Sequence, residues 1–300
     1  MNNMNLKEFF EQSNWKDFEP EPLEEIFTNI CPIQYTRDFL LLTSYFKGIL
    51  RDKEFSERAY QLTYLVIKID PSNYSAWIHR QKCMDKLNIP LESDFALCDS
   101  VIQKNIKNYQ AWMHRRYIVS HTNKYEQELE YTKNILKKDA KNMHAWQQRQ
   151  YINETFDQWD EELEYTASLL AEDIRNNSAW VHRYNTIQHL YSIQKDESIL
   201  KEEIAYIKIS LQITMHNTSI WTYIRGFIRD YSTPSITSLE NWILVLSNAI
   251  HENEYCLLTC ADIYIKRQQP ERAIEMYTQL QNVCPFRNQL WTNLISNLQH

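Results

Sequence analysis

The chain has 300 residues, of which 43% are hydrophobic and 24% are charged, and its formal net charge is −7. This balance is typical of a soluble globular protein and excludes general disorder. The acidic surplus excludes a general attraction to nucleic acid, because phosphate groups are bound by basic surfaces.

The first segment, residues 1–35, lacks both the basic start and the apolar run of a signal peptide. No stretch of the chain reaches the roughly 20 apolar residues that a membrane span requires, so we expect no membrane insertion. Six cysteines form no C-x-x-C pair, which predicts a cytoplasmic protein with free thiols and no structural zinc site. Because NWKDFEPEP is followed by little helical pattern, we predict an extended N-terminal arm over 1–35.

Residues 36–300 are predicted to form one all-α repeat domain. The chain contains two glycines and eight prolines, too few for the many tight turns of an all-β or α/β fold. Two helices are expected first, over FLLLTSYFKGIL and FSERAYQLTYLVIKI within residues 36–69, without the tryptophan that marks the later helices.

Tryptophans then recur with a helical-repeat period. Successive members of this series are 35, 34, 34 and 41 residues apart, and Tyr255 and Trp291 continue it; the tryptophans are Trp77, Trp112, Trp146, Trp180 and Trp221. A period near 34 indicates two helices per repeat. Each αα-hairpin buries its inner face against its neighbours, so the expected fold is a right-handed superhelical crescent, a solenoid of such hairpins.

Each repeat follows one local pattern. An asparagine stands four residues before the tryptophan, at Asn73, Asn108, Asn142, Asn176 and Asn217, and is expected to cap the helix N-terminus. An arginine stands three residues after it in four copies, at Arg80, Arg115, Arg149 and Arg183, where a structural ion pair is favoured over a ligand contact. The second helices are expected over 93–103, 125–137 and 161–171. The tryptophans themselves are predicted to be core residues.

Catalytic and metal-binding motifs are absent from the sequence. There is no G-x-S-x-G, no glycine-rich phosphate loop and no H-E-x-x-H, so the chain is not expected to be a complete enzyme. Histidines two residues after the tryptophan, at His79, His114 and His182, alternate with Gln148 and would lie apart along the stack. We therefore expect no metal site in this chain.

One group of polar residues occupies the first helical turn, or the residue before it, in two adjacent repeats: Lys107, Tyr109, Gln110, Asn142 and His144. Corresponding positions in stacked hairpins align on one rim, so these side chains are expected to converge on one ligand. A lysine beside a helix N-terminus attracts anions, and a glutamine there can bind a carboxylate. The same lysine is also compatible with a merely solvated surface position.

The chain resembles, over essentially its full length, the alpha subunit shared by protein farnesyltransferase and type I protein geranylgeranyltransferase. The resemblance rests on WKDFEPEP (15–22), PIQYTRDF (32–39), RDKEFSERAYQLT (51–63), NYSAWIHR, KNYQAWMHRR, DAKNMHAWQQRQ (139–150), WDEELEYTASLLAEDIRNNSAWVHRY (159–184) and HNTSIWTYIRG (216–226). The alternatives are a non-catalytic tetratricopeptide-like scaffold and the Rab geranylgeranyltransferase alpha subunit.

The resemblance implies a heterodimer with a prenyltransferase beta subunit that holds the catalytic Zn²⁺, while Mg²⁺ accompanies the isoprenoid diphosphate and this chain binds neither metal. It implies that the heterodimer transfers a prenyl group to the cysteine of CaaX-terminal proteins. Lys107 matches the family lysine that approaches the isoprenoid diphosphate, and Gln110 matches the glutamine that binds the CaaX carboxylate.

Further site residues follow from the same resemblance. Tyr74, Tyr109, Asn142 and His144 match substrate-binding positions at the rim, and Arg115, Trp146 and Trp112 match positions that support it. Met143 replaces a family tyrosine, so we expect isoprenoid handling to differ while the mechanism is retained.

Overall fold

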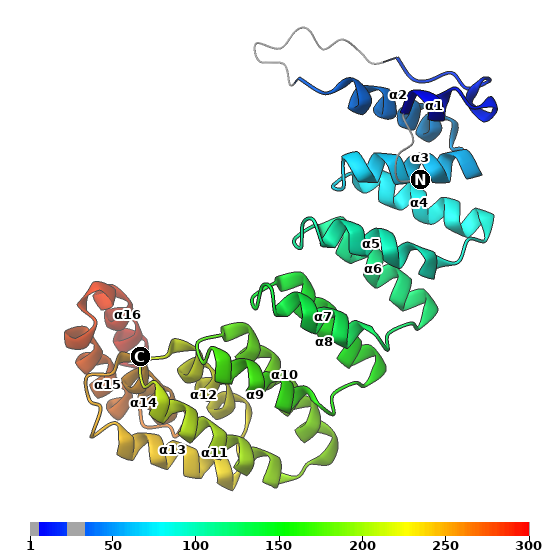
Figure 1. Ribbon diagram of the computed structural model, residues 1–300. Helices are drawn as coiled ribbons and strands as arrows, with labels where there is room; N and C mark the ends of the chain where they lie inside the picture. The colour runs from blue at the N-terminus through cyan, green and yellow to red at the C-terminus, as the bar shows by residue number, and fades with distance from the viewer. Residues whose placement is uncertain (1–5, 23–33, 300) are drawn as a thin grey trace. The chain divides into compact units, whose positions relative to one another are not determined.

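The computed structural model describes residues 6–22 and 34–299, and there it contains helices and no strand. The predicted all-α fold of αα-hairpin repeats is confirmed (Figure 1). The α-helices are α1 (Leu6–Phe10), α2 (Arg37–Asp52), α3 (Glu57–Ile69), α4 (Tyr74–Leu87), α5 (Phe95–Ile102), α6 (Tyr109–Thr122), α7 (Glu128–Leu136), α8 (Met143–Phe156), α9 (Glu162–Glu172), α10 (Asn177–Gln194), α11 (Glu197–Ile213), α12 (Thr218–Asp230), α13 (Pro234–Leu246), α14 (Glu254–Lys266), α15 (Pro270–Val283) and α16 (Asn288–Gln299). Short 3₁₀ turns are η1 (Ser13–Trp15), η2 (Leu91–Asp94) and η3 (Pro285–Arg287).

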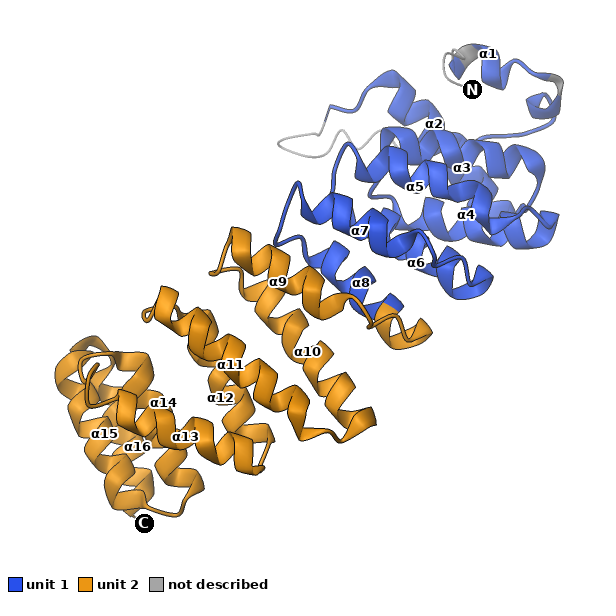
Figure 2. Ribbon diagram, turned by 60° about the horizontal axis from the view of Figure 1, so that its bottom comes forward, with its two compact units in different colours: residues 1–152 blue, residues 153–300 orange. Residues whose placement is uncertain are grey.

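The chain divides into two compact units, residues 1–152 and 153–300, where the sequence predicted one repeat domain over 36–300 (Figure 2). The border falls inside α8. A stack of hairpins has no single core, because each hairpin packs on its immediate neighbours, so a division of this kind is a natural property of repeat proteins.

Within each unit the helices form two layers. In the first unit α3 packs against α4 and α5 against α6, while α4 also lies beside α6. In the second unit α9 packs against α10 and α11 against α12, with α10, α12 and α14 in one layer and α11 beside α13 in the other. The helices that carry Trp77 and Trp112 therefore lie side by side in the first unit, as do those that carry Trp180 and Trp221 in the second.

The predicted asparagine caps are confirmed, and the structure adds a second role for the same side chains. Asn108 accepts the Ala111 N–H through its Oδ1 atom at 2.9 Å, and its Nδ2 atom donates to the carbonyl of Pro71 at 3.2 Å. The same carbonyl accepts the indole N–H of Trp77 at 2.9 Å. One backbone oxygen thus joins the tryptophan of one repeat to the cap of the next.

This arrangement, which we call the carbonyl clamp, recurs along the chain. The carbonyl lies six residues before the tryptophan and receives its indole together with the amide of the next asparagine: Ile106 with Trp112 and Asn142, Ile174 with Trp180 and Asn217, and Met215 with Trp221 and Asn253. Buried carbonyls require such partners, so the repeat pattern also satisfies the backbone of the connecting loops.

The continuation of the tryptophan series to Tyr255 is wrong. Asn253 caps α14 and makes the next clamp, so the position four residues later, equivalent to the tryptophan, is Leu257, which is 1% exposed. Tyr255 is the second residue of α14 and lies two residues, about half a turn, too early. Trp291 is buried, but its indole donates to Cys284, seven residues back, so the last repeat departs from the pattern.

Arginines three residues after the tryptophans are structural, as favoured from the sequence. Arg80 donates to both carboxylate oxygens of Asp94 at 2.7 Å, and the His114 ring binds the same carboxylate at 2.9 Å. Burial raises the pKa of Asp94, but the bonds from His114 and Arg80 outweigh it and the net shift is downward. Equivalent triplets are Arg115, Glu128 and Gln148, and Arg183, Glu203 and Tyr223.

The scarcity of glycine does not prevent sharp helix ends. Among the described residues, six other than glycine adopt positive φ after or near a helix terminus: Lys53, Asn88, Asn123, Asp157, Lys195 and Gln268. The left-handed conformation is tolerated best by Asn and Asp among residues with a side chain. Gly48, by contrast, allows the Phe18 ring to lie close to α2, because a Cβ at this position would be 2.7 Å from that ring.

The N-terminal segment differs from the extended arm expected for 1–35. Its described part contains α1 and η1, and Phe10 stacks on Tyr45 of α2 with ring centroids 3.8 Å apart. Trp15 is buried, and the Arg58 guanidinium lies over its ring. Aromatic burial therefore orders a segment whose sequence has little helical periodicity. The rest of the predicted arm, 1–5 and 23–33, lies outside the described residues.

The described cysteines are free and buried, namely Cys83, Cys98, Cys256, Cys260 and Cys284, and Cys31 lies outside the described residues. Across residues 6–22 and 34–299, none of the helices combines the length and the apolar character needed to cross a bilayer.

Candidate functional site

The predicted rim centres on the loop that joins α5 to α6. Asn105 closes a tight turn there: its Oδ1 atom accepts the Lys107 N–H at 3.1 Å and its carbonyl accepts the Asn108 N–H at 3.0 Å. Asn108 then caps α6. Lys107 therefore stands immediately before a helix N-terminus, with its backbone held by the turn.

The peptide that precedes Lys107 is held by the carbonyl clamp. The Ile106 oxygen accepts the Trp112 indole at 2.9 Å and the Asn142 amide at 3.1 Å. Asn142 also caps its own helix, accepting the Ala145 N–H at 3.0 Å. Trp112 and Asn142, both buried, fix the position of the Lys107 backbone.

His144 is a third support for this loop. Its ring meets Tyr109 edge-on at 4.7 Å and stacks on Trp112 at 6.3 Å between centroids. Burial lowers the pKa of His144 from its ordinary value of 6.5, the nearby Arg116 charge lowers it further, and a hydrogen bond to the Lys107 backbone opposes both. The imidazole is therefore neutral at pH 7, so it serves as a hydrogen-bonding and packing group and adds no charge to the rim.

The Lys107 side chain extends from this fixed backbone into solvent. It is 72% exposed, and its Nζ atom lies 3.6 Å from Oδ2 of Asp139 in the next loop. The Lys107 ammonium is exposed, its backbone is held by hydrogen bonds, and it stands next to the N–H groups of a helix N-terminus. This combination suits an anionic ligand.

Gln110 follows as the second residue of α6 and is half-buried. In the described part of the chain no other side chain binds its amide, so both its donor and acceptor remain for a ligand. A primary amide can donate two hydrogen bonds to a carboxylate.

Three residues share one register position, the first residue of a tryptophan-bearing helix. They are Tyr74 on α4, Tyr109 on α6 and Met143 on α8, and they are 66%, 53% and 52% exposed. Tyr74 and Tyr109 lie on neighbouring helices of one layer. Met143 occupies the third of these positions with a thioether where a tyrosine would present a hydroxyl.

The structure brings five of the predicted residues into one connected cluster: Lys107, Tyr109, Trp112, Asn142 and His144. Tyr74 stands one repeat earlier. Arg115 lies deeper, 4% exposed, where its guanidinium binds Glu128 at 2.7 Å and Asp99 at 2.6 Å. Trp146 is buried, and its indole donates to Ala140 at 3.0 Å, in the loop that carries Asp139.

Two participants were not predicted from the sequence, the Ile106 carbonyl and Asp139. A carbonyl has no sequence signature, so the clamp on Ile106 is visible only in the fold. Asp139 does have one: an aspartate or asparagine stands three residues before the first four capping asparagines, at Asp70, Asn105, Asp139 and Asp173. Each accepts the N–H two residues later, as Asp139 does from Lys141 at 3.3 Å.

Over residues 6–22 and 34–299, no three His, Cys, Asp or Glu side chains are grouped in a way that could hold a metal ion.

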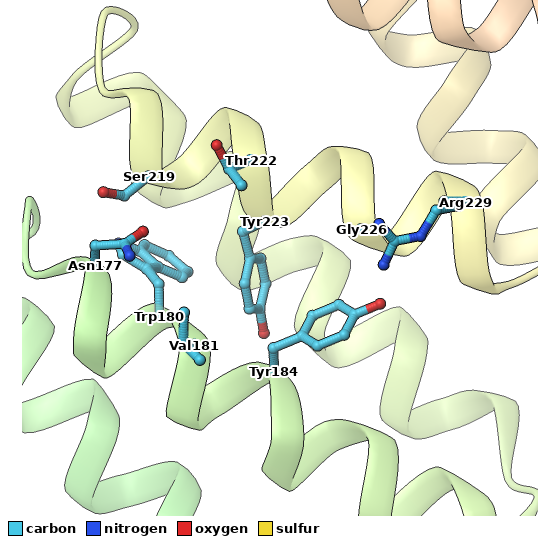
Figure 3. Close-up of a pocket in the computed structure, with 9 residues that line it drawn as sticks. All are labelled: Asn177, Trp180, Val181, Tyr184, Ser219, Thr222, Tyr223, Gly226 and Arg229. Carbon is cyan, nitrogen blue, oxygen red and sulfur yellow. The ribbon is translucent and has the colours of Figure 1, made fainter. Parts of the chain in front are cut away.

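A hollow lies in the second unit, between α10 and α12, and has a volume of about 180 Å³ (Figure 3). Trp180, Val181 and Tyr184 of α10 face Thr222 and Tyr223 of α12 across it. Gly226 permits this approach, because a Cβ there would lie 3.0 Å from the Tyr184 ring. Its mouth combines aromatic walls with an exposed arginine, Arg229.

Comparison with known proteins places these features in a family. Four segments, 56–87, 91–122, 125–156 and 159–190, match the family described as "Protein prenyltransferase alpha subunit repeat". Each segment begins one helix earlier than the hairpins drawn from the sequence, so α3 and α4 form the first repeat and α2 precedes it.

Curated relatives carry one name, protein farnesyltransferase/geranylgeranyltransferase type-1 subunit alpha. The tomato (Solanum lycopersicum) protein is 35% identical over 97 residues, which are 32% of this chain and 28% of that protein, so the match spans little more than a quarter of its length. The Candida albicans protein is 28% identical over 95% of this chain and 97% of its own length.

A solved structure, "Candida albicans protein geranylgeranyltransferase-I complexed with GGPP", shares the fold. It aligns with a TM-score of 0.80 and 28% identity, covering 94% of this chain and 97% of the matched chain. Neither a tetratricopeptide-like scaffold nor a Rab geranylgeranyltransferase alpha subunit is favoured by these matches. Four segments of the chain therefore belong to the protein prenyltransferase alpha-subunit repeat family, and the chain is similar over nearly its full length to relatives named as the subunit shared by farnesyltransferase and type I geranylgeranyltransferase.

Proposed function

We propose that this chain is the alpha subunit of a heterodimeric, cytoplasmic protein prenyltransferase that transfers a farnesyl or geranylgeranyl group to the cysteine of C-terminal CaaX motifs. The observation that carries the proposal is Lys107, an exposed cation whose backbone is fixed by Trp112, Asn142 and His144. The family resemblance explains why a repeat protein would hold one lysine in this way.

Lys107 acts on the diphosphate of the isoprenoid. When the carbon–oxygen bond at C1 breaks, negative charge grows on the departing diphosphate, and a cation already in place stabilises it more than it stabilises the bound substrate. The rigid turn beneath Lys107 means that little of its backbone must be ordered during the reaction. This role raises kcat more than it tightens binding of the isoprenoid.

Gln110 binds the terminal carboxylate of the CaaX peptide through its amide N–H groups, and Tyr74 and Tyr109 present exposed rings along the same layer of helices. Asn142 and His144, whose polar atoms are used by the fold, act mainly by shaping the rim. Arg115 and Trp146 support the helices beneath it.

The remaining chemistry belongs to the partner beta subunit, which supplies the zinc that binds the substrate thiol, the isoprenoid pocket and most of the peptide site, with Mg²⁺ accompanying the diphosphate. The chain is accordingly active only as a heterodimer. Exposed apolar side chains on the tryptophan-bearing helices, such as Met113 and Val181, suit a layer that a partner covers.

Co-expression with a candidate beta subunit tests this proposal. We expect a stoichiometric complex that transfers a labelled farnesyl or geranylgeranyl group from its diphosphate to the cysteine of a CaaX peptide. A peptide whose cysteine is replaced by serine is the control. Absence of a complex, or a complex without transfer from either diphosphate, contradicts the proposal.

A further inference from the structure

We infer that Asp139 is a positioning residue for Lys107, an inference that rests on the proposed function of this rim. The loop of the third repeat contacts the Lys107 region at three points. Asn142 binds the Ile106 carbonyl, the His144 ring packs against Tyr109, and the Asp139 carboxylate lies 3.6 Å from Nζ. The first two contacts fix the backbone, and Asp139 is the contact made to the charged end of the side chain.

The carboxylate of Asp139 is itself held in place. Its Oδ1 atom accepts the Lys141 N–H at 3.3 Å, and the Asp139 N–H donates to Ile135 at the end of α7. Oδ2 is left pointing toward Lys107, and the Asp139 side chain is 24% exposed. A lysine has a flexible four-carbon stem, so a fixed anion restricts where its ammonium lies.

The ion pair is loose and mostly solvated, and pairs of this kind contribute little to folding. Its consequence is therefore local. In the absence of an anionic ligand, Asp139 holds the ammonium beside the loop; a bound diphosphate carries more charge and takes the ammonium over. Asp139 thus orients Lys107 before the diphosphate takes the ammonium over.

The preceding repeat shows which substitution removes the charge of Asp139 and keeps the turn that Asp139 makes with the Lys141 N–H. Asn105, at the equivalent position of the preceding repeat, makes the same turn with an amide oxygen, accepting the Lys107 N–H at 3.1 Å. Asp139→Asn therefore removes the charge and retains the turn. Asp173→Asn is the matched control, because Asp173 makes the same turn with the Arg175 N–H at 2.9 Å.

The test uses the purified heterodimer with farnesyl or geranylgeranyl diphosphate, whichever it transfers. For Asp139→Asn we expect kcat to fall by roughly two- to fivefold while the Kd of the prenyl diphosphate changes little, because Lys107 acts mainly in the transition state. Asp173→Asn is expected to change neither. The inference is overturned if Asp139→Asn behaves like Asp173→Asn, or if its prenyl diphosphate binding weakens.

A second readout does not depend on activity. Acylation of Lys107 by an amine-reactive ester, followed by peptide mass spectrometry, is expected to be about two- to fivefold faster in Asp139→Asn than in the wild-type protein. An unchanged acylation rate would contradict an ion pair between Asp139 and Lys107. If the wild-type complex transfers no prenyl group, the proposed function fails while this measurement still decides whether Asp139 restrains Lys107.

Discussion

At the scale of single residues, polar side chains at the rim divide into those used by the fold and those left for a ligand. In Asn108 and Asn142 the side-chain oxygen caps a helix and the side-chain N–H group donates to the carbonyl of the clamp. His144 is neutral and packs against aromatic rings. Lys107 and Gln110 present their functional groups to solvent or to an incoming molecule. Chemistry is therefore expected from these two residues.

Replacing Lys107 by asparagine is expected to lower kcat of the heterodimer by roughly 10- to 100-fold, with little change in the Kd of the isoprenoid diphosphate. The reason is that charge on the leaving diphosphate is larger in the transition state than in the ground state. Single-turnover kinetics and equilibrium binding measure the two quantities separately. Lys104→Asn, an exposed lysine in the same loop, is the control, and a Lys107 variant of wild-type rate would remove this residue from the mechanism.

Replacing Gln110 by alanine is expected to raise the KM for the CaaX peptide by roughly 10-fold, because two hydrogen bonds to a carboxylate are lost. Steady-state kinetics at saturating isoprenoid diphosphate provide the measurement. A peptide with an amidated C-terminus is the matched comparison and should respond little to the substitution. An unchanged KM for the free-acid peptide would contradict the carboxylate role.

At the scale of the helical element, the carbonyl clamp explains how a structural repeat positions one functional loop. Each clamp joins a tryptophan, a loop carbonyl and the next asparagine, and in the second repeat the clamped carbonyl lies one residue before Lys107. The same contacts that hold neighbouring hairpins together therefore hold the reactive group. The contribution of a clamp to the stability of the fold can be separated from its effect on the position of Lys107 by comparing equivalent residues of two repeats.

The comparison pairs Trp112→Phe with Trp77→Phe. Each substitution retains an aromatic ring and removes one indole hydrogen bond, to Ile106 and Pro71 respectively. We expect both to lower the free energy of unfolding by about 1–2 kcal/mol. Trp112→Phe should also lower kcat, since it loosens the loop of Lys107. Equal kcat values for the two variants would show that the clamp does not position the lysine.

Buried titratable groups predict that acid destabilises the fold. Burial lowers the pKa of His79 and of His144 below the ordinary 6.5, so the unfolded chain takes up protons at a higher pH than the folded chain does. Their stabilisation is fully present above about pH 6.5 and is lost as the pH falls through the folded pKa values. Asp94, whose pKa is lowered from 3.8, extends the loss to more acidic solutions.

Urea unfolding between pH 7.5 and 4.5 tests this expectation, and the free energy of unfolding should decrease steadily below pH 6.5. His79→Gln, which removes one of the buried imidazoles, should show a weaker pH dependence in the same range. A wild-type free energy that stays constant from pH 7.5 to 5.5 would contradict it.

At the scale of the whole molecule, the two helical layers differ in what they present. In the second unit, Val181 of α10 is 52% exposed and lines the hollow shown in Figure 3, whereas Ile209 of α11 is 61% exposed on the other layer. If the partner covers the tryptophan-bearing layer, a charge at Val181 must be buried without a partner, while a charge at Ile209 remains in solvent.

Val181→Glu is therefore expected to weaken association with the beta subunit by 10-fold or more, roughly 1.4 kcal/mol, and Ile209→Glu to leave it unchanged. Co-purification and analytical ultracentrifugation of the two variants measure the difference. Equal affinities would mean that the partner does not cover this hollow, and weakening by Ile209→Glu alone would place the partner on the other layer.

The helices and their caps were predictable because they depend on local contacts. Helix capping by the asparagine before each tryptophan and the periodic spacing of apolar residues depend on contacts within one or two turns, and few glycines interrupt the helices. The predicted second helices therefore lie within a few residues of their observed bounds. The prediction failed at Tyr255, where no tryptophan marks the repeat, and at α1, where aromatic burial against α2 orders a segment without helical periodicity.

The site was predictable in part and for a different reason. Lys107 and Gln110 were identified by their resemblance to a family, since periodicity nominates a rim but does not distinguish a reactive lysine from a solvated one. Asp139 carried a repeating sequence pattern, but its distance to Lys107 depends on how two loops stack. The clamp on Ile106 involves a backbone carbonyl, which every residue has.

By itself, the sequence determined the all-α repeat, the capping asparagines and the arginine at its structural position, because these features depend on contacts within a helix or a hairpin. The tertiary structure decided which polar side chains bind other parts of the fold and which remain available to a ligand. A hydrogen bond between successive loops satisfies Asn142, ring contacts hold His144, and the Lys107 ammonium lies near the Asp139 carboxylate. Such contacts join residues about one repeat apart, and their geometry exists only once the hairpins are stacked.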